Sequence, residues 1–161
     1  MRPNRRAMLS MGLLLVATLA GWSSGRFVPT EASIHKLAPG VYFRKAQTEP
    51  EFTGCNQGWI VFRDFVLVID ANFPDQATGV IAEIRKMTDK PIRYIFDTHY
   101  HGDHADGNMR YTEQGAIAVA SERSGPLFET KGLEGFQQSQ EEKPDEYGKL
   151  TYKRPALYFP R

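Results

Sequence analysis

The chain has 161 residues, of which 41% are hydrophobic and 24% are charged, and its formal net charge is +1. This length supports one folded domain with a sizeable core, and the composition is typical of a globular protein and argues against a largely disordered one. The near-neutral charge, with no basic run beyond the N-terminus, argues against a nucleic-acid partner. The single cysteine, Cys55, excludes an internal disulfide bond.

Residues 1–25 have the layout of an export signal. Arg2, Arg5 and Arg6 precede an uncharged, mostly apolar run, and small residues follow it. The paired arginines also resemble a loose twin-arginine signal. We therefore expect an exported protein, periplasmic or secreted. The alternatives are an uncleaved membrane anchor, although residues 7–22 fall short of the roughly 20 that span a bilayer, or an intracellular N-terminal helix. Contact with a membrane is expected only through this segment.

Residues 26–39 are expected to form a polar linker, in which His35 is interpreted as a surface residue. The domain should occupy residues 40–161. Short strands are predicted at 40–44, 59–62 and 65–70, with a loop over 47–58 and a tight turn before the last of them. The strand at 65–70 is apolar on both faces, which is typical of a strand covered on both sides.

Residues 75–88 have apolar side chains at helical spacing and are predicted to form an amphipathic helix. A second apolar strand follows at 91–97. A strand, a helix and a strand in this order indicate a crossover unit, in which the strands pair in parallel and the helix covers them. Further along, a strand is expected at 115–120 and a short helix from Ser121. The polar residues 132–148 could form a helix or a loop, and residues 151–161 lack a recognisable terminating element.

Three of the four histidines lie between Thr98 and Asn108. In an extended segment the side chains alternate, so His99 and His101 point to the same side and can bind one ion. A turn at Gly102 would let Asp103 and His104 reach a second ion. Two neighbouring ions can share a hydroxide that attacks a carbonyl or phosphoryl group. The alternatives are a histidine-rich polar loop without metal, or a metal-binding loop on an unrelated fold.

The pattern His-x-His-x-Asp-His resembles the first metal motif of the metallo-β-lactamase superfamily. Its form Thr-His-x-His-Gly-Asp-His-x-x-Gly-Asn is similar to the glyoxalase II-like members, and the order of elements from about Gly40 agrees. The resemblance implies an α/β fold of the αβ/βα sandwich type, apparently truncated to its first half. It also implies Zn²⁺ as the cofactor, in a pair of sites. The residues that it assigns to metal binding are His99, His101, Asp103 and His104.

The resemblance further implies that Asp103 is the catalytic residue, because it helps to orient or deprotonate the attacking water. Asp70 would lie beneath the metal loop and support it through hydrogen bonds. The alternative for Asp70 is a turn aspartate or a helix cap.

No histidine follows His104, whereas the family takes further ligands from later in the chain. Two protein ligands per ion are fewer than the three usual for catalytic zinc, and no spacing argument brings in Asp145 or Glu146. One interpretation is the N-terminal part of a metal-dependent hydrolase whose substrate is a small-molecule ester, thioester, amide or lactam. The other is a non-catalytic truncated remnant that binds metal weakly or acts through a partner. In either case the half-fold would expose a sheet surface for an oligomer or a partner to cover.

Overall fold

The computed structural model describes residues 34–46, 48–49 and 52–160, so the expected signal or anchor at 1–25 lies outside the described residues. Seven strands form one mixed sheet in the order β1-β2-β5-β6-β7-β8-β9. Their bounds are β1 (Ile34–Ala38), β2 (Val41–Arg44), β5 (Gln57–Val61), β6 (Val66–Ile69), β7 (Ile92–Asp97), β8 (Ile117–Ser121) and β9 (Leu157–Phe159). A separate small hairpin pairs β3 (Thr48–Glu49) with β4 (Phe52–Thr53).

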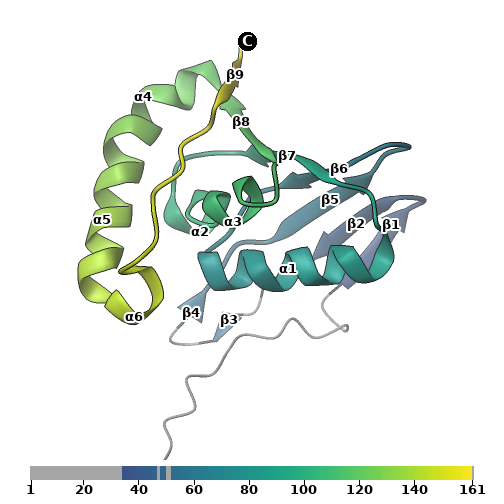
Figure 1. Cartoon of the computed structure of the whole chain (residues 1–161), viewed down its shortest axis with the longest axis horizontal. Coiled ribbons are helices and arrows are strands. Elements are labelled where there is room, and N and C mark those ends of the chain that lie inside the picture. Colours follow the sequence, from purple (N-terminus) through teal and green to yellow (C-terminus); the bar gives the residue numbers. More distant parts are fainter. Residues whose placement is uncertain (1–33, 47, 50–51, 161) are drawn as a thin grey trace, which may run out of the picture.

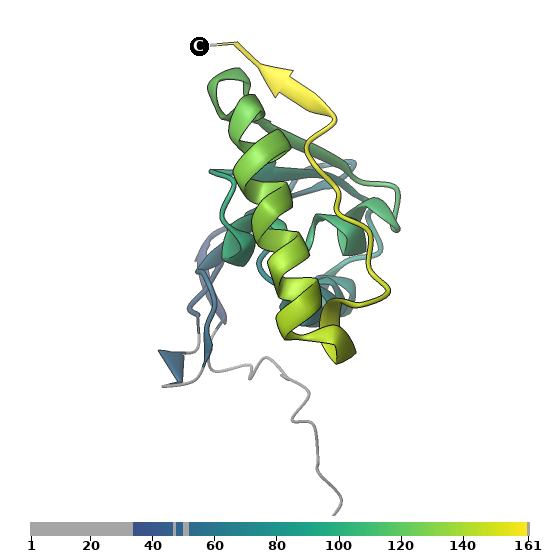
Figure 2. The same ribbon diagram turned by 90° about the vertical axis from the view of Figure 1, so that its left-hand side faces the viewer.

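The helices lie across the sheet and at one end of it (Figure 1). Their bounds are α1 (Pro74–Met87), α2 (Gly102–Ala105), α3 (Asn108–Thr112), α4 (Gly125–Leu127), α5 (Leu133–Glu142) and α6 (Pro144–Tyr147). A 3₁₀ turn and a π-helical turn connect β8 to α5, so α4 and α5 follow one another closely. Figure 2 shows the C-terminal segment running alongside α5 towards β9. None of the helices in the described part of the chain is long and apolar enough to cross a membrane.

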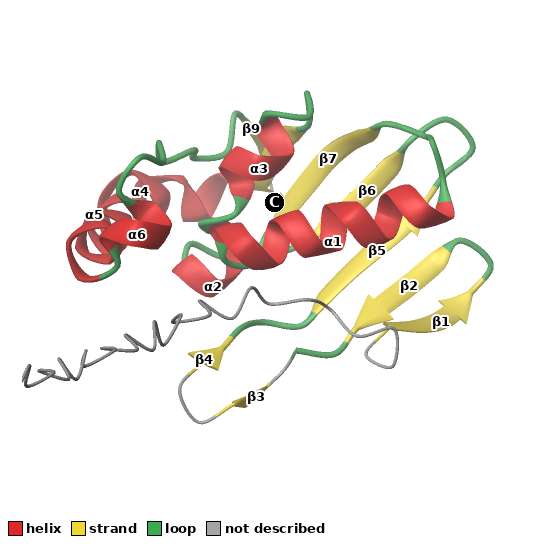
Figure 3. Ribbon diagram, turned by 60° about the horizontal axis from the view of Figure 1, so that its bottom comes forward, coloured by secondary structure: helices red, strands yellow, loops and turns green. Residues whose placement is uncertain are grey.

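One face of the sheet carries the core. Helix α1 lies across this face (Figure 3) and buries Val80 and Ile84 completely. The side chains that it covers come from the neighbouring strands and include Trp59, Val66, Val68, Ile92 and Ile95. Each fully buried aliphatic side chain of this kind contributes about 1.5–3 kcal/mol through removal from water. This packing holds the crossover β6–α1–β7 in place.

The second face of the sheet is only partly covered within the described residues. Along β6 the buried residues Val66 and Val68 alternate with Leu67 and Ile69, which are half-buried. The expectation that this strand is covered on both sides is therefore wrong for the described chain. The physical reason is that the helices in contact with the central strands pack on one face.

Two further expectations need correction, and one open alternative is decided. The segment 34–38, expected in a linker, forms β1 and pairs antiparallel with β2 at the edge of the sheet. The segment 151–161 contains β9, which pairs in parallel with β8. Of the two alternatives for residues 132–148, the helix is the one observed over most of their length, with Phe136 and Tyr147 buried and most of their polar neighbours exposed. His35 is exposed, as predicted, and stacks against Phe43.

Strands β5 and β6 form the predicted hairpin, and β6 and β7 pair in parallel through the crossover helix, as the sequence indicated. The carboxyl ends of β6 and β7 therefore lie side by side at one edge of the sheet. Asp70 follows one of these ends and Thr98 follows the other. This edge carries the candidate site.

Candidate metal centre

Asp70 connects the two strand ends. Its backbone lies in the left-handed region, with φ of 62°, a conformation that aspartate tolerates better than most residues. Its Oδ1 accepts hydrogen bonds from the backbone N–H of Thr98 at 2.8 Å and from the Thr98 hydroxyl at 2.9 Å. Its Oδ2 lies 3.0 Å from Nδ1 of His104. The carboxylate thus holds both the start of the motif and its last histidine.

His99 and His101 form a pair of converging ring nitrogens. Nε2 of His99 lies 3.1 Å from Nδ1 of His101, and Nδ1 of His99 lies 3.0 Å from the Thr98 hydroxyl. Burial lowers the pKa of His99, and His104 and His101 act in the same direction. A lowered pKa favours the neutral imidazole, which is the form that binds a metal ion. The structure therefore brings the ring nitrogens of these two side chains together at the end of β7.

Asp103 and His104 form a second pair. Gly102 begins the short helix α2, so this glycine lies in a helix and not in the loop that the sequence suggested. The helical turn places Nε2 of His104 at 3.3 Å from Oδ2 of Asp103. A Cβ atom at Gly102 would lie 2.6 Å from Oδ2 of Asp106, so a larger residue here would require the Asp106 side chain to shift.

His104 stands between two carboxylates, with Nδ1 towards Asp70 and Nε2 towards Asp103. Burial opposes its protonation, but the hydrogen bond to Asp70 and the charges of Asp70 and Asp103 outweigh this effect and raise the pKa of His104. The His104 ring thus lies between the two acids, in contact with both. Nearby, burial raises the pKa of Asp106 to about 6, and the Tyr147 hydroxyl donates to this carboxylate at 3.1 Å.

Buried polar side chains hold the backbone around Asp70 in place. The Gln57 side-chain amide donates to the backbone carbonyl of Asp70 at 2.8 Å. The guanidinium of Arg44, which is fully buried, donates in turn to the Gln57 side-chain oxygen at 3.0 Å. Asn72 also has a positive φ and donates to the backbone carbonyl of Cys55 at 2.9 Å. These bonds fix two left-handed residues next to the motif.

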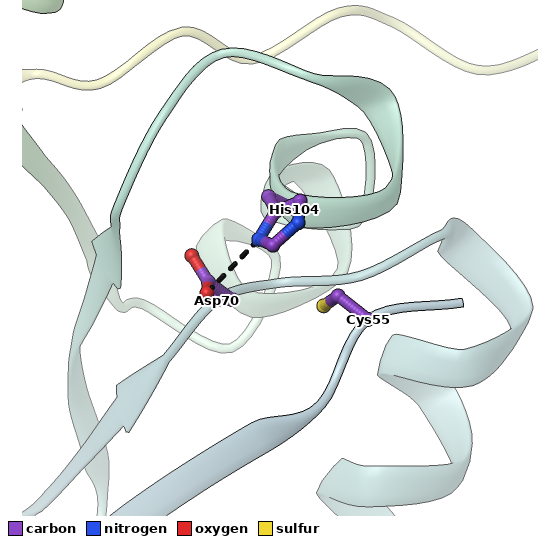
Figure 4. Close-up of side chains that lie close together, drawn as sticks. All are labelled: Cys55, Asp70 and His104. Carbon is purple, nitrogen blue, oxygen red and sulfur yellow. Dashed lines mark ion pairs between the residues drawn. The ribbon is translucent and has the colours of Figure 1, made fainter. Parts of the chain in front are cut away.

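Cys55 is the residue that the sequence did not single out. Its sulfur, a carboxylate oxygen of Asp70 and a ring nitrogen of His104 all lie within 4.8 Å of one another (Figure 4). The cause is the register of the β5–β6 hairpin, in which Gly58 pairs with Ile69 and sets the residues before β5 against those after β6. No local pattern around a lone cysteine reveals this placement. Burial raises the pKa of the thiol, and the charges of Asp70 and Asp103 add to the effect.

Cys55, Asp70 and His104 are the one group of three or more ligand-type residues that converge in the described parts of the chain. Asp145 and Glu146, considered as substitute ligands, do not belong to it. Beside the motif, a pocket of about 310 Å³ is lined by His101 and Asp103 together with residues of α5. This pocket offers space for a small molecule next to the predicted ligands.

Parallel strands, a crossover helix and a histidine-rich loop at the strand ends define an α/β protein with a candidate metal centre at the sheet edge. Residues 50–160 match the family model described as the metallo-β-lactamase superfamily, and the chain belongs to this superfamily. The fold predicted from the motif is thereby confirmed.

Solved structures agree with this assignment. The metallo-β-lactamase from Hirschia baltica superposes with a TM-score of 0.59 at 18% identity, over 78% of this chain and 51% of that one. The metallo-β-lactamase FIM-1 from Pseudomonas aeruginosa, in its mono-zinc form, gives a TM-score of 0.53 at 22% identity, over 62% and 46%. At these identities the likeness shows the fold. The chain spans about half the length of these solved relatives.

A relative by sequence is the linear primary-alkylsulfatase of a Pseudomonas species. It is 45% identical over 49 residues, which make up 30% of this chain and 9% of the alkylsulfatase.

Proposed function

We propose that this chain carries part of the active site of a metal-dependent hydrolase. The observation that carries the proposal is the meeting of two ligand pairs, His99 with His101 and Asp103 with His104, at one sheet edge. Family membership and the adjoining pocket support it. Imidazole and carboxylate donors suit zinc, which we propose as the cofactor.

In this proposal His99 and His101 hold one ion, while Asp103 and Nε2 of His104 hold a second. When bound, zinc supplies Lewis acidity that polarises the scissile group and lowers the pKa of the attacking water. Asp103 lines the pocket, and its carboxylate orients that water and accepts its proton. Asp70 keeps the His104 ring in place through Nδ1, as second partners of metal-bound histidines do.

The proposed substrates are small-molecule esters, thioesters, amides and lactams. The β-lactamases among the solved relatives support lactams, and the alkylsulfatase supports adding alkyl sulfate esters to the candidates.

A non-catalytic role is the second candidate. It is favoured by the small number of ligands, because each proposed ion finds two protein ligands in its pair, fewer than the three usual for catalytic zinc. In that role the chain binds metal weakly, or acts through a partner or a second copy that covers the half-buried sheet face.

The deciding experiment measures zinc content and hydrolysis together in the purified chain. A chromogenic cephalosporin, an acyl thioester, a nitrophenyl ester and an alkyl sulfate form the substrate panel. A hydrolase should retain close to two equivalents of zinc at the two ligand pairs, and His101→Ala or Asp103→Ala should lower the zinc content and abolish turnover. The surface variant Glu113→Ala should match the wild type. Turnover that survives both motif substitutions, or a chain that retains no zinc and turns nothing over, would reject the hydrolase.

We also propose that the protein is exported. The support is the arginine-led, uncharged N-terminal segment described above. Fractionation of a bacterial host expressing the chain should place it outside the cytoplasm, and replacing Arg5 and Arg6 together by glutamine should retain it inside if the twin-arginine route is used. A cytoplasmic wild-type chain would contradict the proposal.

A further inference from the structure

Three separate segments of the chain meet beside the histidine-rich motif, on its buried side. Cys55 lies just before β5, Asp70 just after β6, and His104 on α2. Cys55 and Asp70 are almost fully buried, with relative exposures of 7% and 6%. Figure 4 shows the three side chains gathered in one place, with Asp70 and His104 in direct contact.

The bonding of Asp70 leaves one of its oxygens for this cluster. Oδ1 is taken up by the two short hydrogen bonds from Thr98. Oδ2 is directed at Nδ1 of His104, with a longer contact of 3.1 Å to the Thr98 hydroxyl. The two ring nitrogens of His104 also face different partners, since Nδ1 faces Asp70 while Nε2 faces Asp103. The hydrolase proposal uses Nε2, whereas the inner cluster would use Nδ1. A ring that binds metal through both nitrogens is an imidazolate and has released both of its ring protons to solvent.

We propose that Cys55, Asp70 and Nδ1 of His104 form an inner binding site for a thiophilic divalent ion of the zinc class. The three ligand atoms lie within 4.8 Å of one another and come from a thiol, a carboxylate and an imidazole. On binding, the ion takes the place of the proton between Oδ2 and Nδ1, and this proton and the proton of the Cys55 thiol both pass to solvent. No redox step is involved.

The donor chemistry selects the ion. Thiolate and imidazole ligands favour Zn²⁺ and Co²⁺ over Mg²⁺ and Ca²⁺, which prefer oxygen ligands. The site ties the loop before β5, the end of β6 and helix α2 to one another. Its occupation should therefore stabilise the folded chain, because a ligand that binds only the folded state raises its stability by mass action.

The test uses the full chain freed of metal and titrated with Co²⁺. Cys55 is the only cysteine, so any thiolate-to-cobalt charge-transfer absorption reports this one side chain. We expect the band in the wild type and its loss in Cys55→Ser. Competition with a chromogenic zinc chelator should show at least about a 10-fold weaker zinc affinity in Cys55→Ser. Mg²⁺ should leave the protein unchanged.

His101→Ala is the matched control, because His101 belongs to the His99–His101 pair and not to the inner site. It should keep the charge-transfer band even where hydrolysis is lost, so a failure of the hydrolase proposal and a failure of the inner site give different results. Absence of the band in the wild type, or equal zinc affinities of wild type and Cys55→Ser, overturns the inner site.

A second measurement needs no variant. Zinc should slow the alkylation of Cys55 by iodoacetamide in the wild-type chain, followed by intact mass. An alkylation rate that is the same with zinc and with chelator also overturns the proposal.

Discussion

The contact between Asp70 and His104 can be tested by Asp70→Asn in the metal-free chain. Asparagine has nearly the same shape and also tolerates the positive φ of this position, so the backbone should stay as it is. Its amide oxygen can still accept the two hydrogen bonds from Thr98. What changes is the side facing His104, where an uncharged group replaces the carboxylate oxygen at 3.0 Å from Nδ1.

The magnitude follows from the kind of bond that is lost. A hydrogen bond between charged groups contributes about 1.5–3 kcal/mol to stability, and both partners are mostly buried here. Because Asp70 helps to raise the folded-state pKa of His104, this contribution is fully present below the unfolded-state pKa of histidine. It is lost as the pH rises through the raised folded-state pKa. Wild type and variant should therefore differ by about 1.5–3 kcal/mol near pH 5.5 and much less near pH 9.

The assay is urea unfolding of both proteins between about pH 5.5 and pH 9 with chelator present, a range that brackets the ordinary histidine pKa. Proton NMR of the histidine ring signals should show the pKa of His104 falling in the variant. His104→Gln, alone and combined with Asp70→Asn, isolates the pairwise contribution. A stability difference that is equal at every pH, or an unchanged His104 pKa, would refute the assigned contact.

Three further predictions concern packing and burial. Gly102→Ala should lower the free energy of unfolding, measured in urea, by about 1–3 kcal/mol and weaken zinc retention, because the new Cβ meets Asp106. The control is Gly135→Ala, whose Cβ meets nothing within 4 Å and which should be neutral or slightly stabilising. Equal losses of stability at both glycines would contradict this prediction. Ile84→Ala should cost about 2–5 kcal/mol through the cavity left under α1, and a loss below about 1 kcal/mol would show that the helix does not pack as described. Burial raises the pKa of Asp97 in the folded state. Its protonated form therefore favours folding below the unfolded-state pKa, and the free energy of unfolding falls as the pH rises through the raised folded-state pKa. Asp97→Asn should flatten this part of the stability–pH profile, and an unaltered profile would contradict the prediction.

The candidate site was partly readable from the sequence because its ligands are local. His99, His101, Asp103 and His104 lie within six consecutive residues, and the backbone alone brings them near one another. The crossover from β6 through α1 to β7 was likewise readable, since apolar spacing and strand order are properties of the chain itself. Even here the local geometry differed, because Gly102 starts a helix instead of a turn.

Edge strands were decided only by tertiary pairing. Strand β1 and strand β9 have weak patterns of their own and exist because β2 and β8 offer them backbone partners. The polar stretch at α5 is stabilised as a helix because the Phe136 ring packs against the Tyr147 ring. Such choices depend on neighbours distant in sequence, which propensity does not record.

Cys55 shows the difference most clearly. The sequence determined that the chain has one thiol and, separately, a strand-end aspartate and a histidine-rich motif. Only the register of the β5–β6 hairpin, together with the helical turn at α2, placed the sulfur beside Asp70 and His104. Local spacing can position ligands within one loop, whereas a site built from three segments depends on strand pairing, and pairing is set by the packing of the whole sheet.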